Sequence, residues 1–144
     1  MIAVDTNLLV YAHRGDSEWN ERAYAALAEL ATGSSTWAIP WPCVHEFLSI
    51  ATHPRIYDPP STAAQAIDQL EAWMASPSLA LLAEEGLYWP ALTDVLRAAK
   101  VSGPRVHDAR IAALCRIHGV RELWTADRDF GRFPALVTRN PLIA

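Results

Sequence analysis

The chain opens with MIAVDTNLLVYA, residues 1–12, and this stretch decides the expected fold. Ile2, Ala3 and Val4 form a short apolar run that is typical of a strand buried inside a sheet. Asp5 follows directly, so its carboxylate lies where the strand ends. In parallel α/β sheets, ligands bind beyond the carboxyl ends of the strands. Asp5 is therefore a candidate functional residue.

Short apolar runs and longer segments of helical period alternate along the rest of the chain. Further strands are expected at 37–39, 79–82, 123–125 and 136–138, and helices at 17–32, 42–52, 61–75, 87–100 and 105–118. Strands that alternate with helices predict a parallel sheet covered on both faces. We expect an α/β fold, a three-layer α/β/α sandwich around a central, mainly parallel sheet of four to five strands. The length of 144 residues, without repeat or long linker, suits one domain over residues 1–144.

Charge is distributed unevenly along the chain. The formal net charge is −4, but residues 1–96 carry 12 acids and 3 bases, whereas residues 97–144 carry 4 acids and 9 bases. The basic last third can attract a phosphate backbone, because screening limits the influence of distant acids to about 10 Å. Solvated helix faces would give the same pattern, so each arginine also has a purely structural explanation.

Composition argues against two other classes of protein. No apolar run approaches the roughly 20 residues of a membrane span, and the N-terminus lacks a basic leader and a small-residue cleavage site, so we expect a cytoplasmic protein. Cys43 and Cys115 lack the spacing of a zinc site and are too few for a disulfide framework. We expect both cysteines to be buried, and most of the six tryptophans to be core or interface anchors.

Two acidic residues follow strands and a third lies in an apolar helix. Asp127 comes just after the strand expected at 123–125, as Asp5 comes after the first strand, so their carboxylates should converge. Glu46 lies one helical turn from Cys43 and Ile50, which is an apolar setting for a charge. Converging carboxylates remain ionised when cations lie between them, and their oxygens suit Mg²⁺ or Mn²⁺.

Asp108 is the fourth candidate, in the first turn of the helix expected at 105–118. The helix N-terminus favours its charge whether or not a metal is present. The other acids also have structural explanations, since Asp5 or Asp127 can cap the following helix and Glu46 can pair with an arginine. The neighbouring histidines His45 and His107 should point away, because adjacent helical residues diverge by about 100°.

Four blocks of the sequence together resemble the PIN-domain nucleases, and in particular the VapC toxins of bacterial toxin–antitoxin pairs. The blocks are MIAVDTNLLVYA at 1–12, PWPCVHEFLSIATHPRIY at 40–57, VHDARIAAL at 106–114 and LWTADRDF at 123–130. Each block contributes one acid, and the blocks extend over most of the chain. The resemblance implies a PIN-like version of the sandwich described above.

The resemblance also implies roles for individual residues. The metal-binding and catalytic acids would be Asp5, Glu46, Asp108 and Asp127. Asp129 is an alternate for Asp127, and Thr6, Asn7, Thr125 and Asp129 would orient ligands or water. The residues expected to hold the RNA backbone are Arg105, Arg110, Arg128 and Arg132.

A VapC-like protein would be a toxin and an Mg²⁺-dependent endoribonuclease that hydrolyses phosphodiester bonds in RNA, often transfer or ribosomal RNA. Its expected partners are the RNA substrate, a cognate VapB-type antitoxin and a second copy of the chain in a homodimer, with no membrane. Two alternatives stay open: a PIN-type RNA-processing nuclease that is not a toxin, and a catalytically silent module that binds RNA or protein.

Overall fold

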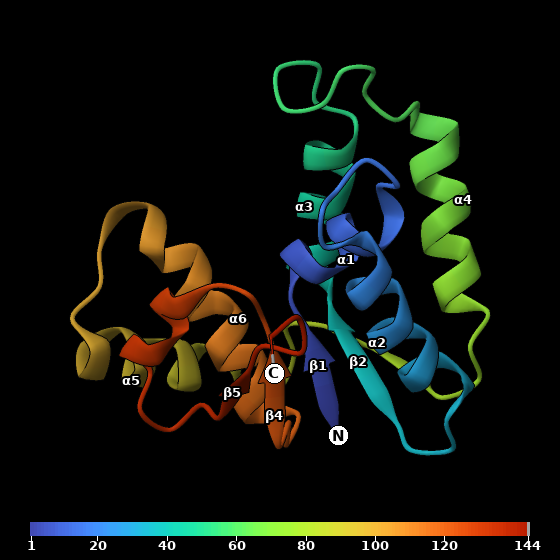
Figure 1. The fold of residues 1–144 in the computed structure, drawn as a ribbon. Coiled ribbons are helices and arrows are strands. Elements are labelled where there is room, and N and C mark those ends of the chain that lie inside the picture. Colours follow the sequence, from blue (N-terminus) through green and yellow to red (C-terminus); the bar gives the residue numbers. More distant parts are fainter. Residues whose placement is uncertain (144) are drawn as a thin grey trace.

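The computed structural model describes residues 1–143, which form a five-stranded parallel sheet in the order β3-β2-β1-β4-β5 (Figure 1). The strands are β1 (Ile2–Val4), β2 (Trp37–Pro40), β3 (Leu79–Leu82), β4 (Glu122–Trp124) and β5 (Thr138–Arg139). The helices are α1 (Thr6–His13), α2 (Asn20–Thr32), α3 (Trp41–Ala51), α4 (Ala63–Met74), α5 (Tyr88–Ala99) and α6 (Val106–Ile117), with the short 3₁₀ helices η1 (Gly103–Arg105) and η2 (Arg128–Arg132).

The strand order places the helices in two layers. The chain moves from β1 to β2 to β3 in one direction and then returns past β1 to β4. Because crossovers between parallel strands are right-handed, this reversal puts α1 to α4 on one face and α5 with α6 on the other. Figure 1 shows α5 and α6 together on one side of the strands and α1 and α2 on the other. The expected three-layer parallel sandwich is confirmed.

The helix α1 was not expected from the sequence. Four of its eight residues, Leu8, Leu9, Val10 and Ala12, have buried apolar side chains, and the polar Thr6 side chain at its start is buried too. A helix buried on most of its surface lacks the apolar and polar stripes that reveal a helical period. β5 also differs, since it begins at Thr138 rather than at residue 136, and as an edge strand it pairs only with β4.

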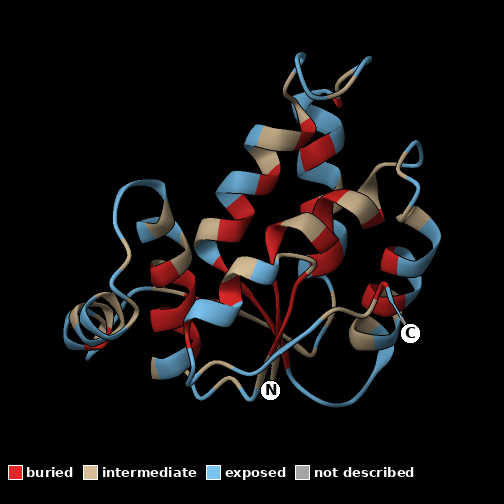
Figure 2. Ribbon diagram, turned by 60° about the vertical axis from the view of Figure 1, so that its left-hand side comes forward, coloured by how far each residue is buried: buried red, intermediate tan, exposed pale blue. Residues whose placement is uncertain are grey.

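The core lies between the sheet and its helices. The strands in the middle of Figure 2 are buried, with helices on both sides. Trp37 of β2 and Phe47 of α3 are completely enclosed, and the Phe47 ring meets Trp73 of α4 edge-on at 5.4 Å between centroids. Both cysteines are buried, as expected. Among the tryptophans, Trp37, Trp73 and Trp124 are core residues, whereas Trp89 is 67% exposed.

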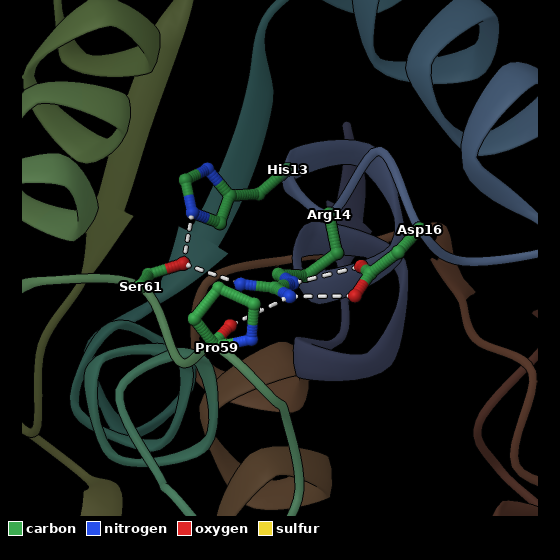
Figure 3. A network of polar contacts seen from close by, with 5 residues as sticks. All are labelled: His13, Arg14, Asp16, Pro59 and Ser61. Carbon is green, nitrogen blue, oxygen red and sulfur yellow. Dashed lines mark hydrogen bonds and ion pairs between the residues drawn. The ribbon is translucent and has the colours of Figure 1, made fainter.

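Arg14 ties the connection between α3 and α4 to the end of α1 (Figure 3). Its guanidinium donates to both carboxylate oxygens of Asp16, at 2.9 and 2.6 Å, to the Pro59 carbonyl oxygen at 3.0 Å and to the Ser61 hydroxyl at 3.2 Å. The same guanidinium stacks over the Tyr57 ring at 4.3 Å. These contacts fix the connection that joins α3, the helix that carries Glu46, to α4.

His13 extends this network toward α4. Its Nε2 lies 2.9 Å from the Ser61 hydroxyl and its Nδ1 lies 3.2 Å from Oε1 of Gln69. With the proton on Nδ1, the ring donates to Gln69 and accepts from Ser61, so all three groups are satisfied. Ser61 is buried, and its backbone N–H donates to the Ala51 carbonyl at 2.8 Å, which ties the connection to the end of α3 as well.

No helix within residues 1–143 is both long and apolar enough to cross a membrane.

Replacing Arg14 with Met should lower the free energy of unfolding by about 2 kcal/mol, because hydrogen bonds to a largely buried charge are each worth more than ordinary ones. Urea denaturation measures the loss, and amide exchange should accelerate at Ser61. The matched control is Arg116→Met, since Arg116 is 56% exposed and lies 3.7 Å from Asp94, so its loss should cost under about 0.5 kcal/mol. Equal effects of the two changes would show that Arg14 is not a structural anchor.

Candidate functional site

Asp5 is the buried centre of the carboxyl edge of the sheet. It lies between β1 and α1, and its side chain caps α1 by accepting a hydrogen bond from the Thr6 backbone N–H at 2.8 Å. Its backbone N–H donates to the Trp124 carbonyl of β4 at 2.9 Å. Only 5% of Asp5 is exposed. The capping explanation considered for Asp5 therefore holds alongside its candidate role.

Thr125 and Asn7 connect Asp5 to the end of β4. The Thr125 hydroxyl donates to Oδ2 of Asp5 at 2.7 Å, and the Asn7 amide donates to the same oxygen at 3.3 Å. The Asn7 side-chain oxygen accepts from the Ala126 N–H at 3.2 Å, and the Thr125 oxygen accepts from the Asp127 N–H at 3.0 Å. Both side chains thus fix the orientation of the Asp5 carboxylate and of the segment that carries Asp127.

Burial raises the pKa of Asp5 from 3.8 to about 6. Hydrogen bonds from Thr125 and Thr6 favour the ionised form, while the negative charges of Glu46 and Asp108 oppose it. The Cys43 thiol lies 3.7 Å from Oδ1 of Asp5, and burial together with the Asp5 charge raises the thiol pKa well above its usual value. Cys43 is therefore a neutral packing neighbour of Asp5.

Glu46 lies on α3 and its surroundings differ from those expected. Cys43 is buried and Ile50 is partly buried, but Glu46 itself is exposed. The expectation of an apolar setting was wrong, because Glu46 lies at the edge of the apolar face of α3 rather than within it. Its charge nevertheless acts on Asp5 and on Asp108. His45 and His107 are both exposed.

Asp108 lies in the first turn of α6 and faces the segment that follows β4. Burial raises its pKa, and the negative charges of Asp127, Asp129 and Glu46 raise it further, whereas Arg105 lowers it. Asp127 precedes η2 and caps it, because its Oδ1 accepts the Asp129 N–H at 2.8 Å. The five acids thus share one region, although Asp127 influences Asp108 more strongly than Asp129 does.

The four arginines expected to contact RNA lie in different surroundings. Arg105 forms an ion pair with Asp129, with 2.8 Å between the guanidinium nitrogen and Oδ2. Arg132 lies with Arg105 in the lining of a cavity beside Asp108. Arg110 instead pairs with Glu84, just beyond β3. Arg128 is exposed at the start of η2.

The donor chemistry of the acids fits a divalent cation. Carboxylate oxygens are hard ligands, and burial, with a further contribution from neighbouring carboxylates, raises the pKa values of Asp5 and Asp108. A bound cation would favour the ionised form of both groups. The Thr6 hydroxyl oxygen, next to Asp5, is buried without a hydrogen-bond partner in the part of the chain that the structure describes. Within that same part, no three His, Cys, Asp or Glu side chains already form a group that could hold a metal ion.

Two features of this region were not expected from the sequence. Lys100 lies in the same cavity lining as Arg105, Arg132 and Asp108, and Asp129 pairs with Arg105 across the gap between η2 and η1. Lys100 is the last residue of the helix expected at 87–100, so the only signal in the sequence was its place in the basic last third.

Fold and site together define a parallel α/β protein with an acidic region at the carboxyl edge of its central strands. The chain belongs to the PIN-domain family, whose model matches residues 2–136. It is 30% identical over 142 residues to the VapC ribonuclease Mb2897 of Mycobacterium bovis, covering 99% of this chain and 96% of that one. It is 28% identical over 137 residues to ribonuclease VapC48 of Mycobacterium tuberculosis, covering 95% and 94%. The resemblance to this family is confirmed.

Solved structures show the same fold. VapBC2 from Rickettsia felis, bound to a DNA fragment from its promoter, matches with a TM-score of 0.71 at 20% identity, covering 97% of this chain and 98% of that one. VapC20 of Mycobacterium tuberculosis, a toxin that cleaves the sarcin–ricin loop, matches with a TM-score of 0.68 at 15% identity, covering 95% and 97%. PIN-domain ribonucleases typically depend on a divalent metal.

Asp5→Asn should stabilise the metal-free protein at neutral pH. A carboxyl group whose pKa is raised on folding stabilises the protein below pH 3.8, and this contribution is lost as the pH rises through about 6. The amide carries no charge but keeps only one of the two acceptor oxygens that Thr6, Thr125 and Asn7 use, so the net gain at pH 7.5 should be about 1–2 kcal/mol. Urea denaturation in EDTA between pH 4 and 8 measures it.

The same titration has a clear contrary result. Wild type should lose stability relative to Asp5→Asn as the pH rises, and added divalent metal should stabilise wild type more than the variant. A constant difference between the two proteins across this pH range would mean that burial does not raise the pKa of Asp5.

Proposed function

We propose that this protein is the toxin of a type II toxin–antitoxin pair, and that it is an Mg²⁺-dependent endoribonuclease acting on transfer or ribosomal RNA. The observation that carries the proposal is the buried Asp5 carboxylate at the carboxyl edge of a PIN fold, held by Thr125, Asn7 and Thr6 and close enough to Glu46 and Asp108 for their charges to raise its pKa. The names of the VapC ribonuclease relatives support the reaction class. On this proposal, residues 1–144 form one nuclease domain.

The metal would be held by Asp5, Glu46, Asp108 and Asp127, and Mn²⁺ could replace Mg²⁺ because it has the same preference for oxygen ligands. When bound, the ion lowers the pKa of a coordinated water and neutralises charge on the scissile phosphate. Thr125 and Asn7 hold the Asp5 carboxylate in place through their hydrogen bonds to Oδ2. Thr6 holds its other oxygen, Oδ1.

Asp127 and Asp129 receive different roles. Asp127 is the stronger influence on Asp108, which supports it as the fourth acid of the metal site. The Asp129 carboxylate is engaged by Arg105 at 2.8 Å. We assign Asp129 to the orientation of Arg105 rather than to the metal.

Asp5→Asn and Asp108→Asn should each reduce cleavage of single-stranded RNA at least about 100-fold, because each removes a charged oxygen ligand. Cleavage in wild type should stop in EDTA and return with Mg²⁺. The control is His107→Gln, an exposed neighbour of Asp108, which should retain wild-type activity. Normal rates in Asp5→Asn or Asp108→Asn would exclude the proposed site, and RNA binding without cleavage under all conditions would favour a silent module.

Asp127→Asn and Asp129→Asn should differ in kinetic effect. Loss of a metal ligand lowers kcat, so Asp127→Asn should reduce kcat at least about tenfold, whereas Asp129→Asn should mainly raise KM because Arg105 loses its orientation. Steady-state cleavage rates over a range of RNA concentrations separate the two parameters. A large loss of kcat in Asp129→Asn with normal kcat in Asp127→Asn would reverse the assignment.

The toxin role implies a VapB-type antitoxin, a homodimer and action in the cytoplasm. Structural neighbours include VapBC complexes, which supports the antitoxin partner. Induced expression of the chain should arrest bacterial growth, and co-expression of a small gene directly adjacent to its own should relieve the arrest. Growth without arrest, combined with RNA cleavage in vitro, would favour an RNA-processing nuclease instead.

A further inference from the structure

A basic cavity lies directly beside the acidic region. Its volume is about 610 Å³, and its lining includes the cationic side chains Lys100, Arg105 and Arg132 together with Ser102, Asp108 and Asp129. Asp108 thus belongs both to the acidic region and to the wall of this cavity. A nucleic-acid backbone that reaches Asp108 would therefore contact these cationic side chains with its phosphates.

Lys100 adopts a backbone conformation that a lysine rarely takes. It ends α5 with φ at 53° and ψ at 39°, in the left-handed region, and its N–H donates to the Leu96 carbonyl. Glycine is the residue that usually occupies this position after a helix, because a Cβ atom is strained there. The side chain of Lys100 is therefore present at a local conformational cost, which calls for a function of the side chain itself.

Arg105 and Arg132 approach the cavity from two different elements. Arg105 ends η1, and its ion pair with Asp129 of η2 restrains the guanidinium at the cavity wall. Arg132 is the last residue of η2 and is exposed. Within residues 1–143, neither Lys100 nor Arg132 has an acidic partner within 4.0 Å, so both charges are available to a ligand.

We infer that Lys100, Arg105 and Arg132 form a subsite that binds an RNA backbone phosphate next to the cleaved bond, with Asp129 as the positioning residue for Arg105. The inference rests on the proposed nuclease function. Phosphates repel a cluster of carboxylates, so an acidic centre needs adjacent cations to retain a polyanion. A single-stranded backbone fits such a subsite without base recognition, since its phosphates are the groups that cations contact.

Lys100→Gly separates this role from a structural one. Glycine relieves the left-handed strain, so the melting temperature should rise by about 2 °C. RNA affinity should nevertheless fall by about three- to tenfold, and the slope of log Kd against log salt concentration should decrease by about 0.7, the value for one phosphate contact on a single strand. If Lys100 only supported the fold, its loss would lower stability and leave the slope unchanged.

The binding probe is a fluorescein-labelled, unstructured single-stranded RNA, followed by anisotropy in EDTA so that no cleavage occurs. Arg105→Gln should reduce the salt slope like Lys100→Gly, and Lys100→Arg should keep it near wild type because the charge remains. Arg121→Gln is the control matched for charge, since Arg121 is exposed beside β4 at the opposite end, where its N–H donates to the Met1 carbonyl.

Equal slopes in Lys100→Gly, Arg105→Gln and Arg121→Gln would overturn the subsite. A polyglutamate peptide provides a second contrary result. If Lys100 and Arg105 were needed for binding of this peptide but not of RNA, the cavity would bind an acidic protein segment and the proposed RNA subsite would be excluded. RNA cleavage by wild type, measured in parallel with Mg²⁺, keeps the two proposals apart. Cleavage with unchanged slopes rejects the subsite alone, whereas absence of cleavage rejects the nuclease.

Discussion

The enclosed carboxylate of Asp5 is the constraint on which the arrangement of this protein depends. The Asp5 side chain caps α1 and accepts a hydrogen bond from the hydroxyl of Thr125, which follows β4. It also experiences the negative charges of Glu46 on α3 and Asp108 on α6. Burying a carboxylate is unfavourable unless hydrogen bonds or cations compensate it. The polar residues at the ends of β1 and β4 therefore serve the fold and the candidate chemistry at once, which explains why the capping and the metal-binding interpretations of Asp5 do not compete.

The charge of the site is balanced over a short distance. The acids of the proposed metal site and the cations of the neighbouring cavity meet at Asp108, and Arg105 lowers the pKa of that carboxyl while its acidic neighbours raise it. Screening confines each charge to about 10 Å, so an acidic protein can still present a locally cationic surface. The net charge of the whole chain is a poor guide to what this region attracts.

Much of the fold could be predicted from sequence, because four of the strands and five of the helices keep clear periods or apolar runs. α1 could not, since burial on nearly all sides removes the contrast between its faces. The acids at strand ends were predictable because Asp5 and Asp127 directly follow apolar runs. The exposure of Glu46 and the pairing of Arg105 with Asp129 were not, because both depend on how α3, η1 and η2 pack in three dimensions.

The pairing of β1 with β4 has a consequence for the growing chain. Asp5 and the Thr125 hydroxyl that holds it are 120 residues apart, and Ile2 pairs with Glu122. During synthesis β1 can pair early with β2, but its second partner, β4, is made only near the end of the chain, and contacts of such long sequence separation form slowly. An unfinished polypeptide that ends before β4 possesses Asp5 and Glu46 but neither the strand nor the hydroxyl that orients the buried carboxylate. The centre can therefore assemble only once nearly the entire chain has been made.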